Sequence, residues 1–283
     1  MHPHRLSILG VGLLGGSLGL AAKSSLSGCR VVGYAHRRET LQAALASGAI
    51  DDGYDEPAAA VRDADLIVLC TPVGLLGEML DRIAPFLSPR AIVTDVGSTK
   101  ASIVRVAETR HASVRFVGSH PMAGSEKRGV QFAQGDLFHN AVCITTPTRQ
   151  TDPDALEQVE GFWRRLGMRL KRLPPDDHDR MICDVSHLPH AVAAALMTMQ
   201  DESALDLTGK GFLDATRIAG GDGGLWRDIF LDNRGNLLDS IRRLKQTLAQ
   251  LESLLEPDRA EALRMWLDNA AARRGRAGTT QER

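Results

Sequence analysis

Short apolar runs alternate with helix-forming segments through the first half of the chain. The apolar runs have the length and composition of buried strands, so we predict strands at residues 6–9, 30–34, 65–70, 91–95, 115–118 and 141–146. Segments rich in small residues or with helical spacing lie between them, at 13–24, 40–47, 75–86 and 100–109. Strands that alternate with helices in this way predict a parallel sheet covered by helices on both faces.

The pattern changes after residue 147. We predict one more helix at 152–166 and an edge strand at 168–173, and no convincing strand from residue 176 onward. Long alanine- and leucine-rich stretches with helical spacing follow at 182–199, 226–255 and 257–272, with a glycine-rich interruption at 209–224. The last residues, 273–283, are polar and expected to lack order. The domain boundary therefore falls near residue 175, between an α/β domain at 1–175 and an all-α domain at 176–283.

The helical part is short for a domain that has to bury its apolar faces alone. Its leucines recur with heptad-like spacing, at Leu237, Leu238, Leu244, Leu248, Leu251 and Leu255. They can pack within the chain or against a second chain. We favour a homodimer formed through the helical domain, because helical domains of this kind often pair.

Composition narrows the class of protein. The net charge is −1 and aromatic residues make up 4% of the chain, so nothing favours binding to nucleic acid or to an anionic membrane. No apolar run approaches the roughly 18 residues that span a bilayer. The four cysteines form no Cys-x-x-Cys pair, which is typical of core thiols in a reducing compartment. The N-terminus runs directly into a predicted strand and leaves no room for a signal peptide, so we expect a cytoplasmic protein.

A glycine loop follows the first predicted strand. Gly10, Gly12 and Gly15 match Gly-x-Gly-x-x-Gly, and Leu13 and Leu14 begin the next helix. The first glycine permits a tight turn, the second lets the backbone approach a pyrophosphate, and the third allows close packing of helix on strand. Glycines also mark ordinary turns, but a loop between strand and helix is the required context. The loop predicts a dinucleotide site in a Rossmann-type domain.

The end of the second predicted strand bears on which dinucleotide binds. An NAD site usually places an acid there, on the ribose 2′-hydroxyl. Ala35 occupies that position, and His36, Arg37 and Arg38 follow it. Guanidinium groups bind phosphate well, so we predict NADP, with NAD possible. Glu39 lies beyond the strand end, and the alternative for the arginines is a solvated turn.

Histidines supply the candidate proton chemistry. His120 follows a strand and precedes Pro121, which predicts a loop at the carboxyl edge of the sheet, where ligands of such folds bind. A histidine beside a nicotinamide can accept a proton as hydride leaves, although a lone histidine is more often a hydrogen-bonded core or surface residue. His187 and His190 are three residues apart and share a predicted helix face. A metal site is the rival interpretation; we expect none, because the spacing offers no third ligand and no His-Glu-x-x-His.

Several motifs occur in a characteristic order. They lie at residues 10–17, 70–72, 95–100, 120–124, 178–179, 186–190, 216–219 and 226–228. Together they resemble the prephenate/arogenate dehydrogenase family, along nearly the whole chain. The resemblance implies a Rossmann-type domain followed by an all-helical dimerisation domain. It also implies oxidative decarboxylation of prephenate or arogenate, which gives 4-hydroxyphenylpyruvate or tyrosine.

The resemblance also implies roles for individual residues. His120 matches the family's catalytic base, and Ser98 matches a neighbour that hydrogen-bonds to it beside the cofactor. Arg217 matches an arginine that binds a substrate carboxylate. The remaining matches are the pocket residues His187 and His190 and the cofactor-binding residues Cys70, Thr71 and Pro72.

Some of these residues have structural alternatives. Ser98 can cap the helix that starts near residue 100. Arg217 can pair with Asp214 or Asp222 at the surface, and Asp179 can cap the long helix that follows it.

Glu126 is open to two functional interpretations. Its carboxylate can form a gating ion pair with Arg217. It can instead lie beside the substrate side chain, attract the ammonium group of arogenate and disfavour the neutral ketone of prephenate. The sequence leaves the preferred substrate undecided.

Two other functions are alternatives. Another two-domain dehydrogenase, of the β-hydroxyacid dehydrogenase or imine reductase type, would be expected to carry a lysine or a different polar group where this chain has His187 and His190. A non-catalytic NADP sensor would bind cofactor without turnover. The combination of His120, Ser98 and Arg217 favours the enzyme.

Overall fold

The computed structural model describes residues 3–125 and 127–279. The chain divides into two compact units, Met1–Arg234 and Gly235–Arg283. No helix in the described ranges is both long and apolar enough to cross a membrane.

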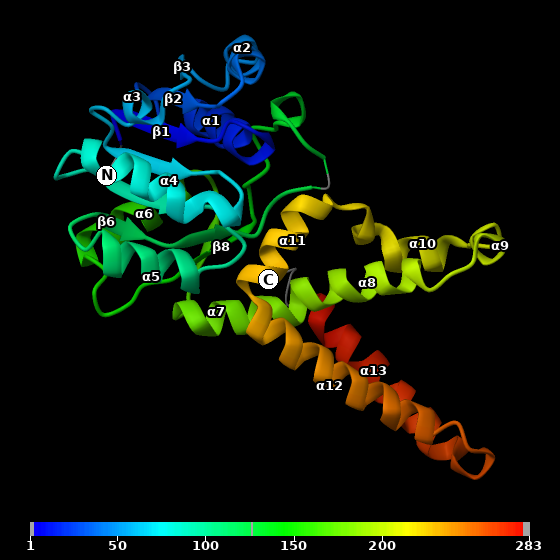
Figure 1. The fold of residues 1–283 in the computed structure, drawn as a ribbon. Helices are drawn as coiled ribbons and strands as arrows, with labels where there is room; N and C mark the ends of the chain where they lie inside the picture. The colour runs from blue at the N-terminus through cyan, green and yellow to red at the C-terminus, as the bar shows by residue number, and fades with distance from the viewer. Residues whose placement is uncertain (1–2, 126, 280–283) are drawn as a thin grey trace. The chain divides into compact units, whose positions relative to one another are not determined.

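A six-stranded parallel sheet forms the centre of the first unit (Figure 1). A parallel sheet was predicted, but its strand at residues 52–54 was not. Its strands run in the order β3-β2-β1-β4-β5-β6, so the chain starts in the middle and winds outward in both directions. The bounds are β1 Arg5–Leu9, β2 Arg30–Tyr34, β3 Asp52–Tyr54, β4 Leu66–Leu69, β5 Ile92–Asp95 and β6 Arg115–Val117. This strand order brings the carboxyl ends of β1 and β4 side by side.

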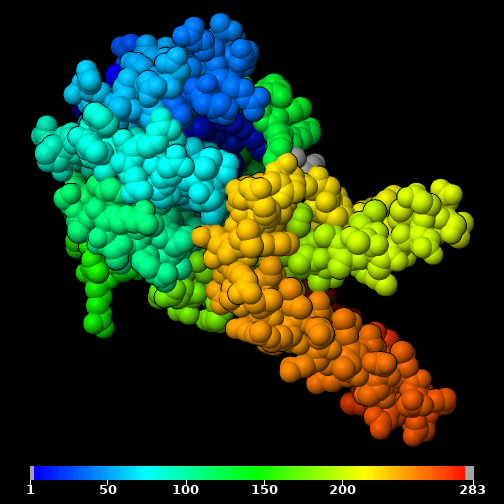
Figure 2. All heavy atoms as spheres, viewed as in Figure 1, coloured from blue at the N-terminus to red at the C-terminus, as the bar shows by residue number. Residues whose placement is uncertain are grey.

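Helices cover both faces of this sheet, because successive strand side chains point to opposite sides. Leu6 and Ile8 pack with Leu18 of α1 in one core cluster, which α6 also joins. Leu9 packs in the other cluster with residues of α3, α4 and α5. Figure 2 shows side chains of α4 and α5, in cyan and blue-green, hiding the strands beneath. The helices are α1 Leu13–Ser25, α2 Arg38–Ala46, α3 Pro57–Ala60, α4 Leu76–Ile83, α5 Ala101–Arg110 and α6 Pro153–Arg165.

A separate three-stranded sheet corrects one part of the predicted topology. The expected strands at 141–146 and 168–173 become β8 (Val142–Thr145) and β9 (Arg169–Arg172), which do not join the main sheet. Their parallel pair is extended by β7 (Ser119–Pro121), which runs antiparallel to β8. His120 therefore lies within a strand, and the expectation of a loop was wrong. The chain passes from the six-stranded sheet to the three-stranded sheet at Gly118. A Cβ atom there would lie 2.4 Å from Oγ1 of Thr146, so only glycine fits without a shift.

Helices make up the rest of the first unit. They are α7 Pro175–Ile182, a π-helical turn at Cys183–His187, α8 Leu188–Thr198, α9 Glu202–Leu205, α10 Lys210–Thr216, a 3₁₀ turn at Arg217–Gly220, and α11 Gly223–Asp232. Among the described residues no strand follows β9, as predicted. The glycine-rich stretch is not a simple interruption, because α10 lies inside it. The helix expected over 226–255 is also broken, at Asn233, which separates α11 from α12.

The second unit consists of the helices α12 (Arg234–Ser253, which starts one residue before the unit) and α13 (Ala260–Thr279). Residues 273–279 were expected to lack order, but they are helical, because α13 continues to Thr279. That expectation was wrong for these residues. Several large apolar side chains of this unit are more than half exposed, namely Leu248, Leu255, Met265 and Leu267. A single copy thus leaves apolar surface uncovered on these helices.

Candidate active site

The glycine loop between β1 and α1 leaves room for a ligand at one glycine and none at the others. A Cβ atom on Gly10, whose φ is +112°, would lie 2.7 Å from the carbonyl oxygen of Cys70. One on Gly15 would lie 2.1 Å from the carbonyl oxygen of Gly10. Gly12 has no heavy atom within 4 Å of its Cβ position, and it precedes α1 without a side-chain cap. An open glycine before uncapped helix N–H groups fits a pyrophosphate.

The segment after β4 lies against this loop. Cys70 donates its backbone N–H to the carbonyl of Leu9, and its own carbonyl backs Gly10. The hydroxyl oxygen of Thr71 is buried and has no hydrogen-bond partner within the described residues. Pro72 is exposed beside it. Because buried hydroxyl groups normally find a partner, Thr71 fits a position that contacts a bound dinucleotide.

A basic group follows β2. Ala35 is buried at the strand end, and no acid stands in its place. The side chain of Arg37 donates from Nε to Nε2 of His36 at 3.2 Å. Arg38 lies 3.6 Å from the carboxylate of Asp55, which follows β3, and both side chains are exposed. This acid could not be predicted from the sequence, because the pairing of β2 with β3 is what brings Asp55 near the arginines.

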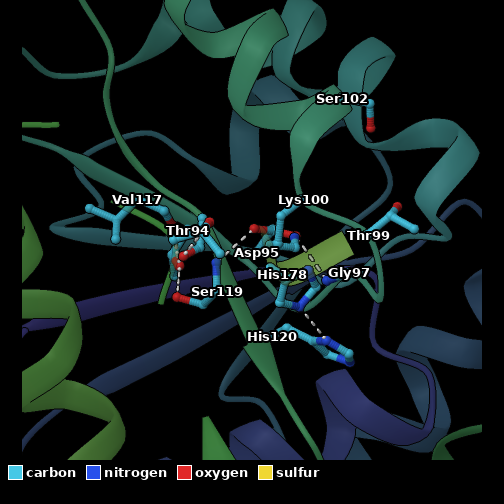
Figure 3. A network of polar contacts seen from close by, with 12 residues as sticks. Thr94, Asp95, Gly97, Thr99, Lys100, Ser102, Val117, Ser119, His120 and His178 are labelled. Carbon is cyan, nitrogen blue, oxygen red and sulfur yellow. Dashed lines mark hydrogen bonds and ion pairs between the residues drawn. The ribbon is translucent and has the colours of Figure 1, made fainter. Parts of the chain in front are cut away.

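Three side chains form a hydrogen-bonded chain that ends at His120. Figure 3 shows its last contact, between His178 and His120. Nδ1 of His120 lies 2.9 Å from Nε2 of His178, and Nδ1 of His178 lies 2.8 Å from Oδ1 of Asp179. A carboxylate only accepts, so Nδ1 of His178 carries a proton and its Nε2 accepts one from Nδ1 of His120. The free lone pair of neutral His120 is therefore on Nε2. His178 was not among the predicted site residues, although its motif was visible.

Asp179 also holds the start of α5. Its carboxylate accepts from the backbone N–H groups of Lys100 at 2.7 Å and Ala101 at 2.9 Å. It does not cap its own helix, which follows Pro174, so that alternative was wrong. A carboxylate at a helix N-terminus is electrostatically favourable, and here it also fixes the ring of His178.

Ser98 lies half-buried in the turn between β5 and α5. The first N–H groups of α5 are taken by Asp179 and not by Ser98, which removes the capping alternative. Within the described residues, no hydrogen bond joins Ser98 to His120. The position of Ser98 at the carboxyl edge of the sheet suits a cofactor contact, and its role stays a prediction.

A fully buried ion pair lies behind His120. Lys100 contacts the carboxylate of Asp95, which also accepts from the backbone N–H groups of Gly97 at 2.8 Å and Ser119 at 3.1 Å. Asp95 thus joins the end of β5 to the residue that precedes His120 (Figure 3). Burial and, to a smaller extent, the nearby ammonium group of Lys100 lower the pKa of His120 well below its usual value of 6.5. His120 is accordingly neutral, and able to accept a proton, at neutral pH.

His187 and His190 converge on Trp226. The ring of His190 stacks on Trp226 with centroids 3.5 Å apart, and the ring of His187 meets Trp226 edge-on at 6.2 Å. Both histidines are buried. Burial lowers the pKa of His187 to about 4 and also lowers the pKa of His190. Asn233 contacts both Nδ1 of His187 and the backbone carbonyl of Asp179, so His187 lies close to the residues that support His120.

Arg217 begins the 3₁₀ turn that packs against α8, and its side chain is exposed. The two acids named as its surface partners have other contacts: Asp214 pairs with Lys210 at 2.7 Å, and Asp222 pairs with Arg128. Glu126 lies outside the described residues.

Two family models match the chain. One is described as the nucleotide-binding domain of prephenate dehydrogenase and matches residues 18–172. The other is described as the dimerization domain of prephenate dehydrogenase and matches residues 174–269.

Individual proteins are similar over most of the chain. The prephenate dehydrogenase of Bacillus subtilis is 37% identical over 264 residues, which is 90% of this chain and 71% of that protein. The cyclohexadienyl dehydrogenase of Zymomonas mobilis is 31% identical over 257 residues, or 88% of each chain.

Solved structures agree. The prephenate dehydrogenase of Aquifex aeolicus, in complex with hydroxyphenyl propionate and NAD+, has a TM-score of 0.90 and 33% identity, and the match covers 96% of this chain and 98% of that one. The arogenate dehydrogenase of Synechocystis has a TM-score of 0.83 and 31% identity over 96% of this chain and 99% of that one.

Proposed function

The chain belongs to the prephenate dehydrogenase family of oxidoreductases, and on that premise we propose that it oxidatively decarboxylates prephenate, arogenate or both, using NADP. The observation that carries the proposal is the chain of hydrogen bonds from Asp179 through His178 to His120. It supplies a neutral imidazole nitrogen at the carboxyl edge of a dinucleotide-binding sheet.

The reaction requires a base for the proton of the ring hydroxyl and a binding site for carboxylate. The substrate is a cyclohexadiene with a carboxylate at C1 and a hydroxyl at C4. Hydride leaves C4, the C4 hydroxyl loses its proton, and carbon dioxide leaves C1 as the ring becomes aromatic. The nicotinamide, when bound, supplies the hydride acceptor.

We assign the base to Nε2 of His120. As this nitrogen takes the C4 hydroxyl proton, positive charge develops on the imidazole ring of His120. His178 accepts the hydrogen bond from Nδ1 and Asp179 places its negative charge behind His178, so the relay stabilises that charge. Burial of His120 and His178 keeps water from competing for these hydrogen bonds.

Substrate binding is assigned to His187, His190 and the residues around them. Arg217 is proposed to bind a carboxylate, and His187 and His190 to line the pocket with Trp226 behind them. These roles rest on the family pattern and on the convergence of the rings.

The preference for NADP is assigned to His36, Arg37 and Arg38. It is supported by the residue at the end of β2, which is Ala35 and not the acid that an NAD site usually carries. Arg38 forms an ion pair with Asp55, whereas Arg37 donates a hydrogen bond to the neighbouring His36 and has no ion pair with an acid among the described residues. Arg37 is therefore proposed to contribute more of the 2′-phosphate contact.

A homodimer through the helical domain is proposed as the working form. It is supported by the family's dimerization domain and by the exposed apolar side chains of α12 and α13. A cytoplasmic location stays a prediction.

One assay tests the function. Purified protein is supplied with prephenate or arogenate, each with NADP or NAD, and reduced nicotinamide is followed together with carbon dioxide release. We expect stoichiometric NADPH and carbon dioxide from at least one substrate. A β-hydroxy acid such as 3-hydroxyisobutyrate serves as the control for the other dehydrogenase type. Turnover of the control without turnover of either cyclohexadiene would contradict the proposal.

A further inference from the structure

The two ring nitrogens of His187 have different surroundings. Nδ1 lies 3.1 Å from the side-chain nitrogen of Asn233, in the break between α11 and α12. Nε2 is buried and has no hydrogen-bond partner within the described residues. His187 itself is fully buried. An unpaired polar atom in such a place is uncommon and calls for a partner other than the residues that the structure describes.

The orientation of the Asn233 amide follows from a second contact. Nδ2 of Asn233 also donates to the backbone carbonyl of Asp179 at 2.8 Å. A carbonyl can only accept, so the atom that faces it must be the amide nitrogen. The same nitrogen then donates to Nδ1 of His187, which must be an unprotonated acceptor. The proton of neutral His187 is therefore on Nε2.

We propose that Asn233 is a positioning residue that holds His187 in its Nε2–H tautomer, so that this ring donates a hydrogen bond to an acceptor oxygen of the bound substrate. This rests on the proposed function only for the identity of the substrate. The oxygen is a hydrogen-bond acceptor of the substrate, either a carboxylate, a carbonyl or a hydroxyl oxygen, because an N–H group can only donate.

The groups around His187 agree with a neutral donor. Asp179 is held by His178 and the start of α5, and His190 and Trp226 face the ring from α8 and α11. The pKa of His187, about 4, keeps the ring uncharged at neutral pH. The positive charge for a substrate carboxylate must then come from another residue, which is the role assigned to Arg217.

The proposal also explains why the predicted helix over 226–255 breaks. Asn233 adopts φ −103° and ψ 29°, outside a regular helix, and its side chain is buried. Both hydrogen bonds of its amide nitrogen go to α7 and the π-helical turn. The break between α11 and α12 thereby places the amide nitrogen of Asn233 where it can donate to Nδ1 of His187.

The test uses the full-length protein labelled with ¹⁵N in its histidines. The signals of His187 are identified by their loss in His187→Gln, and two-bond ¹⁵N–¹H spectra at pH 8 report which nitrogen is protonated. We expect an unprotonated Nδ1 and a protonated Nε2 in the ligand-free enzyme, and a shift of the Nε2 proton when 4-hydroxyphenylpyruvate is added. A proton on Nδ1 in the wild-type protein would overturn the proposal, whatever substrate the enzyme proves to use.

The variant Asn233→Asp replaces the donor by an acceptor. It should move the proton of His187 to Nδ1 at pH 8 and raise KM for the substrate roughly tenfold or more, while the affinity for NADP is retained. Asn140→Asp, the same change at an exposed position, should alter neither tautomer nor KM. A reversed tautomer with unchanged KM would exclude the donor role. If Asn233→Asp does not fold, the wild-type spectrum with and without 4-hydroxyphenylpyruvate still decides the proposal. Failure to turn over prephenate or arogenate would count against the proposed function alone.

Discussion

Nδ1 of His120 and Nε2 of His178 lie 2.9 Å apart, although 58 residues separate them in the sequence. This contact sets the tautomer of His120, because Asp179 requires the proton of His178 on the opposite nitrogen. It connects the short strand β7 to the first helix of the predicted helical domain. The arrangement leads to the first prediction.

Asp179→Asn should lower kcat by on the order of 10²–10⁴, the contribution of general-base catalysis, because the amide no longer fixes the tautomers of His178 and His120. KM for the substrate and the affinity for NADP should change little, since Asp179 contacts neither in the proposed site. Steady-state kinetics with both parameters resolved provide the check. A variant with wild-type kcat would show that His120 does not depend on the relay.

Arg217→Gln should raise KM roughly ten- to a hundredfold. A charge-assisted hydrogen bond to a carboxylate contributes about 1.5–3 kcal/mol, and glutamine keeps a donor but loses the charge. The matched control is Arg180→Gln, an exposed arginine that pairs with Asp177 at 2.8 Å. An unchanged KM in Arg217→Gln, equal to that of the control, would return Arg217 to a surface role.

Arg37→Ala should weaken NADP binding roughly ten- to a hundredfold and leave NAD binding nearly unchanged, because only NADP carries the 2′-phosphate. Arg38→Ala should have a smaller effect, since Asp55 already engages Arg38. Dissociation constants for both cofactors measure the difference. If the wild-type enzyme prefers NAD, or if Arg37→Ala binds NADP normally, the basic group after β2 does not select the cofactor.

The stability of the protein should fall as the pH falls below 6.5, in part because of His187. Its folded-state pKa, about 4, lies below the unfolded value of about 6.5, so the unfolded state binds the proton first. The stabilisation is complete above pH 6.5 and is lost as the pH approaches 4. Between pH 7 and pH 5 this single group should remove about 2 kcal/mol.

Denaturant unfolding of wild-type protein and His187→Gln at fixed protein concentration tests this dependence. The variant should lose about 2 kcal/mol less than wild type over that pH interval. His139→Gln, the same change at an exposed residue, should keep the wild-type dependence. Parallel curves for wild type and His187→Gln would mean that His187 is protonated to the same extent in both states.

Local signals were enough to predict most of the main sheet. Each central strand is a continuous apolar run, because both faces of a parallel sheet are buried, and the glycine loop marked where β1 meets α1. The strand β7 could not be predicted in this way. It has three residues, and its place depends on Asp95 accepting the N–H of Ser119 and on pairing with β8.

The candidate site shows the same division. His120, His187 and His190 were predicted from motifs, and the structure brings them to one region. The partner of His120 was missed because a hydrogen bond between distant histidines leaves no periodic pattern in the sequence. Asn233 was missed for a related reason: the helical spacing continues past it, and only its contacts with Asp179 and His187 reveal the break.

The central claim is that Nε2 of His120 removes the substrate hydroxyl proton during hydride transfer. The most direct measurement is the single-turnover rate of NADPH formation by His120→Asn at saturating substrate and cofactor, compared with wild type. We expect a rate lower by roughly two to four orders of magnitude, the usual scale for loss of a general base, with the dissociation constant for NADP nearly unchanged. A variant that forms NADPH at a near-normal rate would contradict the assignment.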